Sequence, residues 1–258
     1  MDHLTRLLAS TRARVEESKV KVPADGLEPR LASVEPSRGF ADALRTATIS
    51  LIAEVKRATP SRGELDLGLN AADTAVSFAL GGAAAISVLT EPDEFRGSLE
   101  DLAAVRSAGL PVLRKDFIID DYQVLESRAA GADAILLIVR ALEDEELASL
   151  VKAADVLGLD ALVEVHDATE LERALAAGAS VVGVNHRDLA TFEIDPDRTA
   201  RLAPGIPDDV LLVALSGVQS RADVEYLEAA GADAVLVGES LILSQDPAAK
   251  VRELLGRA

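Results

Sequence analysis

Cysteine is absent from this chain of 258 residues, which excludes disulfides, thiolate metal sites and cysteine nucleophiles. Aromatic residues make up only 3% of the chain, which argues against a surface that stacks on nucleobases. Basic residues number 26 against 44 acidic ones, and the formal net charge of −18 argues against nucleic acid or an anionic membrane as a partner. The sequence lacks both a membrane-length apolar run and a signal-peptide pattern at its start. We therefore expect a soluble, cytoplasmic protein with no membrane or nucleic-acid partner.

Short apolar runs alternate with helix-like segments from about residue 48 onward. Several of the helix-like segments begin with Ser, Asp or Asn and close with Gly, as capped helices do. The tag AAGAD occurs at 129–133 and again at 229–233, each time between a helix and an apolar run. This repeat predicts an α/β fold, a (β/α)8 TIM barrel over residues 48–258, with an open doubly wound sheet as the structural alternative. The eight expected strands are 49–55, 83–89, 110–114, 132–139, 160–165, 180–185, 210–215 and 232–238.

Residues 1–47 precede the first expected strand and predict an N-terminal helical extension. Residues 3–18 resemble an amphipathic helix, 23–37 a proline-containing connector, and 39–45 a second short helix. The pattern leaves open whether this extension caps the barrel or only decorates it. We expect residues 1–258 to form a single domain that is a monomer or a weak homodimer.

Charged residues occupy positions in the first expected strand where a core would be apolar. Side chains alternate along a strand, so Glu54 and Lys56 point the same way as Ile52. In a TIM barrel the carboxyl ends of the strands carry the chemistry. Basic residues at this rim of an acidic chain indicate an anionic ligand. Polar residues also end other expected strands: Arg57, Arg114, Lys115, Asp116, Glu164, Asn185, His186, Arg187 and Asp188.

The loops after the seventh and eighth expected strands are typical of a phosphate site in such barrels. Their sequences, SGVQS and VGESL, contain glycines that permit close approach of the backbone to a ligand. The turn TPSRG after the first strand adds Thr59 and Ser61 as donors. A phosphate ester is therefore the expected ligand.

Two lysines and two glutamates are expected to converge without a metal site, because the three histidines show no ligand spacing. Such a set suits proton transfer between carboxylates and ammonium groups. Neighbouring lysines in a partly desolvated pocket should have lowered pKa values. A Schiff-base lysine is the competing chemical hypothesis.

Motifs along almost the whole barrel resemble those of indole-3-glycerol phosphate synthase. They include IAEVKRATPSRG, SVLTEPDEFRGSLEDL, VLRKDFIIDDYQV, LDALVEVHD, VGVNHRDLATFEID and GADAVLVGESL, in this order between about residues 38 and 245. The resemblance implies a cofactor-free carbon–carbon lyase of tryptophan biosynthesis. Its reaction closes 1-(2-carboxyphenylamino)-1-deoxyribulose 5-phosphate to indole-3-glycerol phosphate with loss of CO₂ and water.

The resemblance also implies roles for individual residues. Lys115 would be the general acid at the keto or hydroxyl oxygen of the substrate, and Glu164 the acid–base partner in dehydration. Lys56 would hold the anthranilate carboxylate and is a second candidate proton donor. Glu54 and Asn185 would complete the catalytic set. The implied substrate contacts are Arg187 at polar groups, Phe95, Phe117 and Leu189 around the aromatic ring, and Thr59, Ser216, Gly217, Gly238, Glu239 and Ser240 at or near the phosphate.

One position departs from the family pattern. The family usually has Glu before the Ser-Gly pair of the seventh strand, where this chain has Leu215. A missing carboxylate puts the protonation of Lys115 or Lys56 in doubt. His186 also varies, and we expect its side chain to point away from the site. The alternatives are a non-catalytic barrel that binds a phosphorylated ligand, favoured only by Leu215, and a sister sugar-phosphate isomerase barrel.

Overall fold

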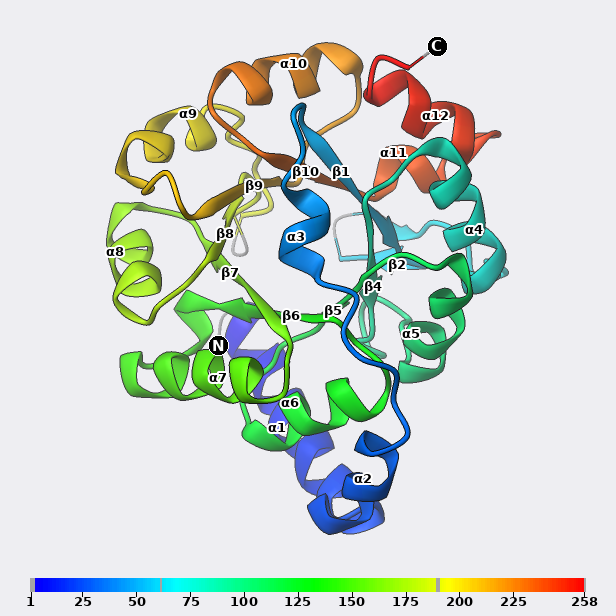
Figure 1. Ribbon diagram of the computed structural model, residues 1–258, viewed down its shortest axis with the longest axis vertical. Helices are drawn as coiled ribbons and strands as arrows, with labels where there is room; N and C mark the ends of the chain where they lie inside the picture. Colours follow the sequence, from blue (N-terminus) through cyan, green and yellow to red (C-terminus); the bar gives the residue numbers. More distant parts are fainter. Residues whose placement is uncertain (1–2, 61, 189–190, 258) are drawn as a thin grey trace.

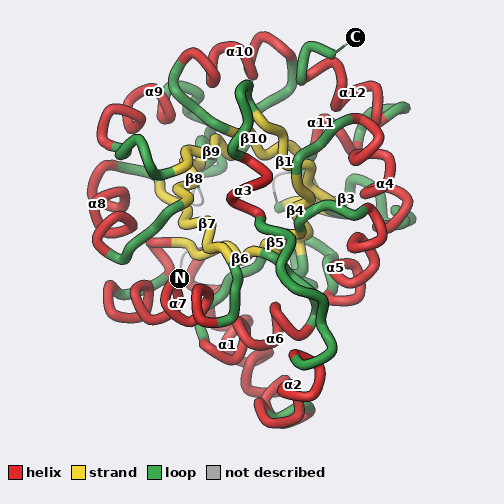
Figure 2. The backbone as a smooth tube through the Cα atoms, in the orientation of Figure 1, coloured by secondary structure: helices red, strands yellow, loops and turns green. Residues whose placement is uncertain are grey.

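Eight parallel strands close into a barrel in the computed structural model, which describes residues 3–60, 62–188 and 191–257. Each strand overlaps one of the predicted apolar runs: β1 (Ser50–Val55), β4 (Ala85–Leu89), β5 (Val112–Lys115), β6 (Ala134–Ile138), β7 (Asp160–Val165), β8 (Val181–Asn185), β9 (Leu211–Leu215) and β10 (Ala234–Val237). Because β1 pairs with both β10 and β4, the sheet closes on itself, and Figure 2 shows it as a ring inside a ring of helices. The predicted (β/α)8 fold is confirmed, and the open-sheet alternative is wrong.

Helices return the chain from the end of each strand to the start of the next, as Figure 1 shows. Several begin at a side-chain cap that accepts a hydrogen bond from a backbone N–H group, among them Asn70, Ser98, Asp167 and Ser220. Only a short hairpin, β2 (Ala58–Thr59) and β3 (Gly63–Glu64), lies between β1 and its helix. The helices after the strands are α4 (Ala71–Gly81), α5 (Leu99–Val105), α6 (Asp121–Ala129), α7 (Asp144–Val156), α8 (Ala168–Ala176), α9 (Arg198–Leu202), α10 (Arg221–Ala229), α11 (Glu239–Ile242) and α12 (Pro247–Leu254), with 3-10 turns η1 (Arg106–Ala108), η2 (Val139–Ala141) and η3 (Ala203–Gly205).

Strand side chains alternate between two apolar layers. Ile52 and Leu162 belong to the cluster inside the barrel, whereas Leu51 and Val163 belong to the cluster between strands and helices. Burial of each such side chain contributes about 1.5–3 kcal/mol. The predicted shared face of Ile52 and Glu54 is confirmed, because Glu54 is 2% exposed and continues the inward row of β1.

The N-terminal extension covers both ends of the barrel. It consists of α1 (His3–Lys21), α2 (Ala24–Leu31) and α3 (Phe40–Leu44). Phe40 and Leu44 are fully buried in the interior cluster, and α3 lies across the near end of the barrel in Figure 1. At the opposite end, Leu4 and Leu7 of α1 line the main pocket. The N-terminal extension therefore caps the barrel.

One prediction for the extension is wrong. Residues 24–31, expected in a connector, form helix α2 with Pro29 inside it. Leu27, at 2% exposure, packs in a cluster with Val15 of α1 and Tyr122 of α6. Burial of Leu27 in this cluster outweighs the low helix propensity of proline. A prediction from local sequence alone cannot include this burial and therefore misses the helix.

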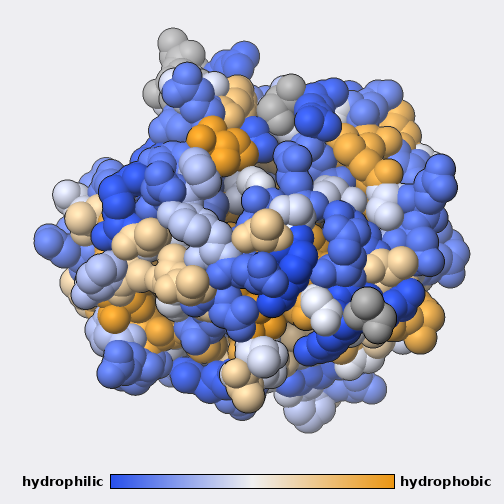
Figure 3. Space-filling view, turned by 90° about the horizontal axis from the view of Figure 1, so that it is seen from above, coloured by the Kyte–Doolittle hydropathy of each residue, from blue (hydrophilic) through white to orange (hydrophobic). Residues whose placement is uncertain are grey.

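Membrane-length apolar helices and clusters of metal-ligating side chains are both absent from the described residues. None of their helices is long and apolar enough to cross a membrane. Within the same residues, no group of three His, Asp or Glu side chains could hold a metal ion. On the face seen in Figure 3, hydrophilic residues predominate and apolar residues form small separate groups.

The aspartate of the repeated AAGAD tag accepts the same kind of backbone hydrogen bond in both copies. Asp133 Oδ2 accepts the backbone N–H of Val112 at 2.8 Å, and Asp233 Oδ2 accepts that of Leu212 at 2.7 Å. In each case the aspartate at the start of one strand fixes the start of the preceding strand. Asp133 is fully buried and also accepts the N–H of Arg38 at 3.0 Å, which ties the extension to the barrel.

Substitution of Asp133 should therefore destabilise the chain more than substitution of its counterpart. We expect Asp133→Ala to lower the free energy of unfolding by about 2 kcal/mol or more, because it leaves two N–H groups without an acceptor. Asp233→Ala is the matched control, and since Asp233 is exposed we expect a loss below about 1 kcal/mol. Urea unfolding followed by circular dichroism measures both. Equal losses of unfolding free energy in the two variants would contradict the larger structural role assigned to Asp133.

Candidate active site

The carboxyl ends of the barrel strands open into a pocket of about 410 Å³. This volume is within the range of small-molecule sites. Most of the residues expected at the site lie on its wall: Glu54, Lys56, Thr59, Phe95, Lys115, Phe117, Asn185, Arg187, Ser216, Gly217, Gly238, Glu239 and Ser240. Leu189 lies outside the residues that the structure describes.

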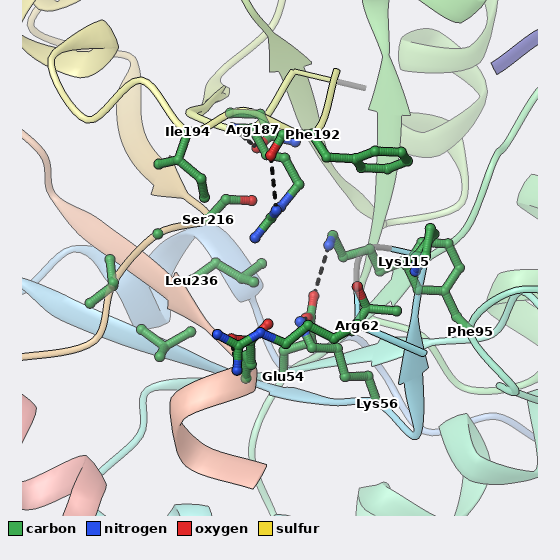
Figure 4. A pocket seen from close by; sticks show the side chains of 18 of the residues that line it. Glu54, Lys56, Arg62, Phe95, Lys115, Arg187, Phe192, Ile194, Ser216 and Leu236 are labelled. Carbon is green, nitrogen blue, oxygen red and sulfur yellow. Dashed lines mark hydrogen bonds and ion pairs between the residues drawn. The ribbon is translucent and has the colours of Figure 1, made fainter. Parts of the chain in front are cut away.

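A buried carboxylate binds two lysines at the centre of this pocket. Glu54 Oε2 is 2.8 Å from Lys115 Nζ, and Glu54 Oε1 is 2.8 Å from Lys56 Nζ. Figure 4 shows these three side chains side by side, with Glu54 between β1 and the lysine of β5. Gly238 makes room for them, because a Cβ atom there would lie 2.5 Å from Glu54 Oε1. The glycine of VGESL is thus required by close packing at the site.

The charges of this cluster are mutually stabilised. Burial alone raises the pKa of Glu54, but the ammonium groups of Lys115 and Lys56 outweigh it and lower that pKa to about 2. Burial lowers the pKa of Lys115, yet the carboxylates of Glu54 and Glu164 outweigh burial and the opposing Arg187, so the net pKa is raised above 10.5. The expectation of a lowered lysine pKa is therefore wrong for Lys115, because carboxylates rather than the second lysine dominate its surroundings.

Glu164 lies beneath the pocket wall at the end of β7, with 2% of its surface exposed. Its Oε1 accepts a hydrogen bond from Asn185 Nδ2 at 3.0 Å. The Asn185 Oδ1 atom in turn accepts the backbone N–H of Arg187 at 3.0 Å. The orientation of Glu164 is thus fixed by the end of the neighbouring strand β8.

Tight backbone turns shape the opposite side of the pocket. Ser216 and Gly217 both adopt left-handed conformations, with φ of 68° and 88°. A non-glycine residue with this φ is uncommon and often occurs at functional sites. Ser240 Oγ donates a hydrogen bond to the carbonyl oxygen of Val218 at 3.2 Å, which joins the loops after β9 and β10. The two loops predicted to hold phosphate are therefore adjacent.

Several of the expected rim residues do not line the pocket. The guanidinium of Arg57 donates to both carboxylate oxygens of Asp101 and to the carbonyl oxygen of Leu69, which anchors the loop before α4. Arg114 pairs with Asp116 at 3.0 Å on the outer face of β5. These charges are structural, because an odd step along a strand turns a side chain to the opposite face. The expected orientation of His186 is confirmed, since its Nε2 lies 2.7 Å from Thr199 Oγ1.

Sequence reasoning missed several residues of the pocket wall. Arg62 forms an ion pair with Glu239 at 3.2 Å across the mouth, and its place in the TPSRG turn was a usable signal. His3 lies 2.9 Å from Glu94 and contacts the ring of Phe192 edge-on at a centroid distance of 5.3 Å. No local pattern predicts such contacts between distant segments. The missed wall residues include His3, Leu4, Leu7, Arg62, Phe192, Ile194, Gln219 and Lys250.

Leu215 occupies the position where a carboxylate was expected by resemblance. Its side chain is 1% exposed and belongs to the apolar cluster inside the barrel. A Cβ atom at Gly183 would lie 2.9 Å from Leu215 Cδ1, so the leucine fills the space beside β8. Lys56 and Lys115 therefore share the single carboxylate of Glu54.

The lowered pKa of Glu54 predicts a specific dependence of stability on pH. A carboxyl whose pKa falls from 4.5 to about 2 on folding stabilises the chain fully above pH 4.5 and loses this contribution as the pH falls toward 2. The difference in unfolding free energy between the parent chain and Glu54→Gln should therefore shrink over that interval. Urea unfolding at a series of pH values measures it. Glu172→Gln, at an exposed position, is the control. A difference in unfolding free energy between the parent chain and Glu54→Gln that stays constant with pH would refute the link between Glu54 ionisation and stability.

Comparison with known proteins gives a consistent result over almost the whole chain. The model of the family described as indole-3-glycerol phosphate synthase matches residues 4–254. An indole-3-glycerol phosphate synthase from Mycolicibacterium vanbaalenii is 50% identical over 253 residues, which cover 98% of this chain and 93% of that protein. The protein of the same name from Mycolicibacterium smegmatis is 49% identical with the same coverage.

Solved structures of more distant proteins share the fold alone. Thiamine phosphate pyrophosphorylase from Pyrococcus furiosus superposes with a TM-score of 0.62 at 16% identity, covering 81% of this chain and 95% of that one. The 3-hexulose-6-phosphate synthase of Salmonella typhimurium gives 0.60 at 17% identity, covering 81% and 100%. The sister sugar-phosphate isomerase alternative is set aside by the family match. The chain belongs to the indole-3-glycerol phosphate synthase family, the decarboxylating lyases of tryptophan biosynthesis.

Proposed function

We propose that this pocket closes the indole ring of 1-(2-carboxyphenylamino)-1-deoxyribulose 5-phosphate, releasing CO₂ and water. The observation that carries the proposal is the Glu54–Lys56–Lys115 cluster, in which two ammonium groups share one buried carboxylate inside an anion-sized pocket. A cluster with one net positive charge suits a substrate that brings a carboxylate and a phosphate. Positive charge at this rim explains how an acidic chain attracts an anion.

Lys115 is the proposed general acid of the condensation. The ring carbon that bears the carboxylate attacks the keto carbon, and the keto oxygen needs a proton as the new bond forms. Lys115 is protonated at neutral pH because its pKa is raised, so it carries that proton when substrate arrives. Departure of CO₂ then restores the aromatic ring. Lys56 and Arg187 provide positive charge for the carboxylate before it leaves.

Glu164 and Asn185 are proposed to serve the dehydration. Loss of the hydroxyl as water needs one proton delivered to that oxygen and another removed from the adjacent carbon. Glu164 is buried and held by Asn185 at 3.0 Å, which gives it a fixed orientation. A fixed acid–base group reduces the reorganisation that the step requires.

The remaining wall residues are proposed to bind the two ends of the substrate. Phe95 and Phe117 offer apolar surface for the aromatic ring, with Leu4, Leu7 and Phe192 beside them. Thr59, Ser216, Gly217, Gly238, Glu239 and Ser240 surround the phosphate end, where backbone N–H groups of tight turns are suitable donors. Leu189 is proposed for the ring by resemblance only.

The phosphorylated substrate is the only partner that we propose. A doubly charged phosphate ester does not leave a cell readily, which supports a cytoplasmic location. We further propose that residues 1–258 act as one domain, because α1 contributes to the pocket and α3 closes the barrel. A monomer or weak homodimer is the proposed state, and sedimentation velocity tests it.

Removal of the general acid should abolish turnover. We expect Lys115→Ala to lower kcat by about a thousandfold or more, because general acid catalysis and electrostatic stabilisation are both lost. Formation of indole-3-glycerol phosphate from the synthetic substrate is followed by its absorbance. Lys152→Ala, at an exposed position of α7, is the control and should keep full activity. Full activity of Lys115→Ala would contradict its role as general acid, whereas a parent chain that forms no more product than Lys115→Ala would favour the non-catalytic, ligand-binding alternative.

A carboxylate at position 215 should change the pH dependence of turnover. We expect Leu215→Glu to retain the fold and to move the alkaline limb of the kcat profile to higher pH, because an added negative charge favours the protonated lysines. Leu215→Gln, equal in size but uncharged, should leave that limb in place. An identical profile for both variants would show that this position does not influence the lysines.

A further inference from the structure

His166 is a buried titratable residue that the proposed mechanism does not use. It follows β7 directly and lies two residues after Glu164, on the same inward row. Its side chain is 1% exposed, and its Nε2 lies 3.5 Å from Glu164 Oε1. Within the described part of the chain, this Nε2 makes no hydrogen bond. A buried polar atom without a partner at a catalytic carboxylate requires an explanation.

The other side of the imidazole is firmly held. His166 Nδ1 lies 3.0 Å from Glu170 Oε2, which also accepts the backbone N–H of His166 at 2.8 Å. Glu170 Oε1 accepts from Arg140 Nε at 2.8 Å. Burial raises the pKa of Glu170, but the hydrogen bonds from His166 and Arg140 outweigh it and lower that pKa. An acceptor at Nδ1 places a hydrogen there and leaves Nε2 free to exchange a proton with Glu164.

We propose that His166 is a positioning residue that acts through Glu164 by exchanging a proton with it during turnover. This inference rests on the proposed role of Glu164. When Glu164 takes a proton from the substrate, Oε1 passes it to Nε2, and the imidazolium is stabilised by the Glu170 carboxylate. When Glu164 must be protonated, the same proton returns. No bond other than N–H and O–H forms or breaks, and the net charge of the pair is unchanged.

The surroundings of the pair favour such an exchange. Lys115 and Asn185 act on Glu164 from β5 and β8. Glu170 faces the imidazole from α8, and Arg140 faces Glu170 from η2. Arg140 Nη1 lies 3.7 Å from Asp188 Oδ2, so the row of polar groups extends from the buried Glu164 to half-exposed side chains. A guanidinium does not release its proton, so Arg140 holds Glu170 in place and the imidazole is the group that stores the proton given up by the buried Glu164.

Two substitutions of similar size separate the contacts of the imidazole. The amide of His166→Gln reaches the position of Nε2 and can hydrogen-bond Glu164, whereas that of His166→Asn reaches Nδ1 and keeps only the Glu170 contact. Neither amide titrates. We expect kcat to fall about tenfold or more in both, and further in His166→Asn, with KM changed less than about twofold. We also expect both to lose one limb of the kcat profile, because neither amide exchanges a proton with Glu164.

Several outcomes would overturn the proposal. An unchanged kcat profile in His166→Gln, or equal losses in both variants with the profile retained, would reduce His166 to a structural residue. Circular dichroism and the thermal midpoint verify that each variant folds. Should His166→Asn fail to fold, the profile of His166→Gln still decides.

A double-mutant cycle distinguishes this inference from the proposed function. In the Glu164→Gln background, His166→Gln should cause little further loss of kcat, because the partner for proton exchange is already absent. Independent, additive losses would refute the exchange while leaving Glu164 as a catalytic group. Full activity of Glu164→Gln alone would instead overturn the assigned role of Glu164 and this inference with it.

Discussion

One carboxylate, Glu54, determines the charge balance of the whole site. Its two oxygens bind Lys56 and Lys115 at 2.8 Å each, and without them a carboxylate at 2% exposure would not stay ionised. The lysines depend equally on Glu54, since like charges in a half-buried pocket repel. This mutual dependence explains why Gly238 must lack a side chain and why the strand carries charge on its inward face.

The barrel brings this charged cluster together with the other residues of the binding site. Parallel strands deliver residues from positions 54 to 240 to a single rim, and the loops after β9 and β10 become neighbours there. The extension completes the arrangement, because α3 fills one end of the barrel and α1 contributes to the pocket wall at the other. Residues that fasten this frame, such as Asp133 and Arg57, contact no part of the pocket yet decide where its side chains lie.

Leu215 illustrates how this chain differs from the family pattern without losing its charge balance. The apolar side chain of Leu215 packs beside Gly183, and Glu54 binds both lysines. The buried polar row from Glu164 through His166 to Glu170 begins on β7, and Asn185, which binds Glu164, is the register partner of Leu215 on β9. The lysine side and the glutamate side of the pocket are electrostatically linked, because the Glu164 carboxylate helps to raise the pKa of Lys115.

The sequence by itself determined the strand positions and the barrel, because apolar runs and glycine tags are local patterns. Strand-end charges and loop glycines indicated part of the pocket wall, whereas Phe95 and Phe117 were expected only by resemblance. It also determined that Ile52 and Glu54 share a face, since alternation is a property of every strand. Only the tertiary structure decided that Arg57 pairs with Asp101, that His3 reaches Glu94, that residues 24–31 are helical, and that the pKa of Lys115 is raised. Each of these depends on which distant groups come within a few ångströms, and no local pattern encodes that distance.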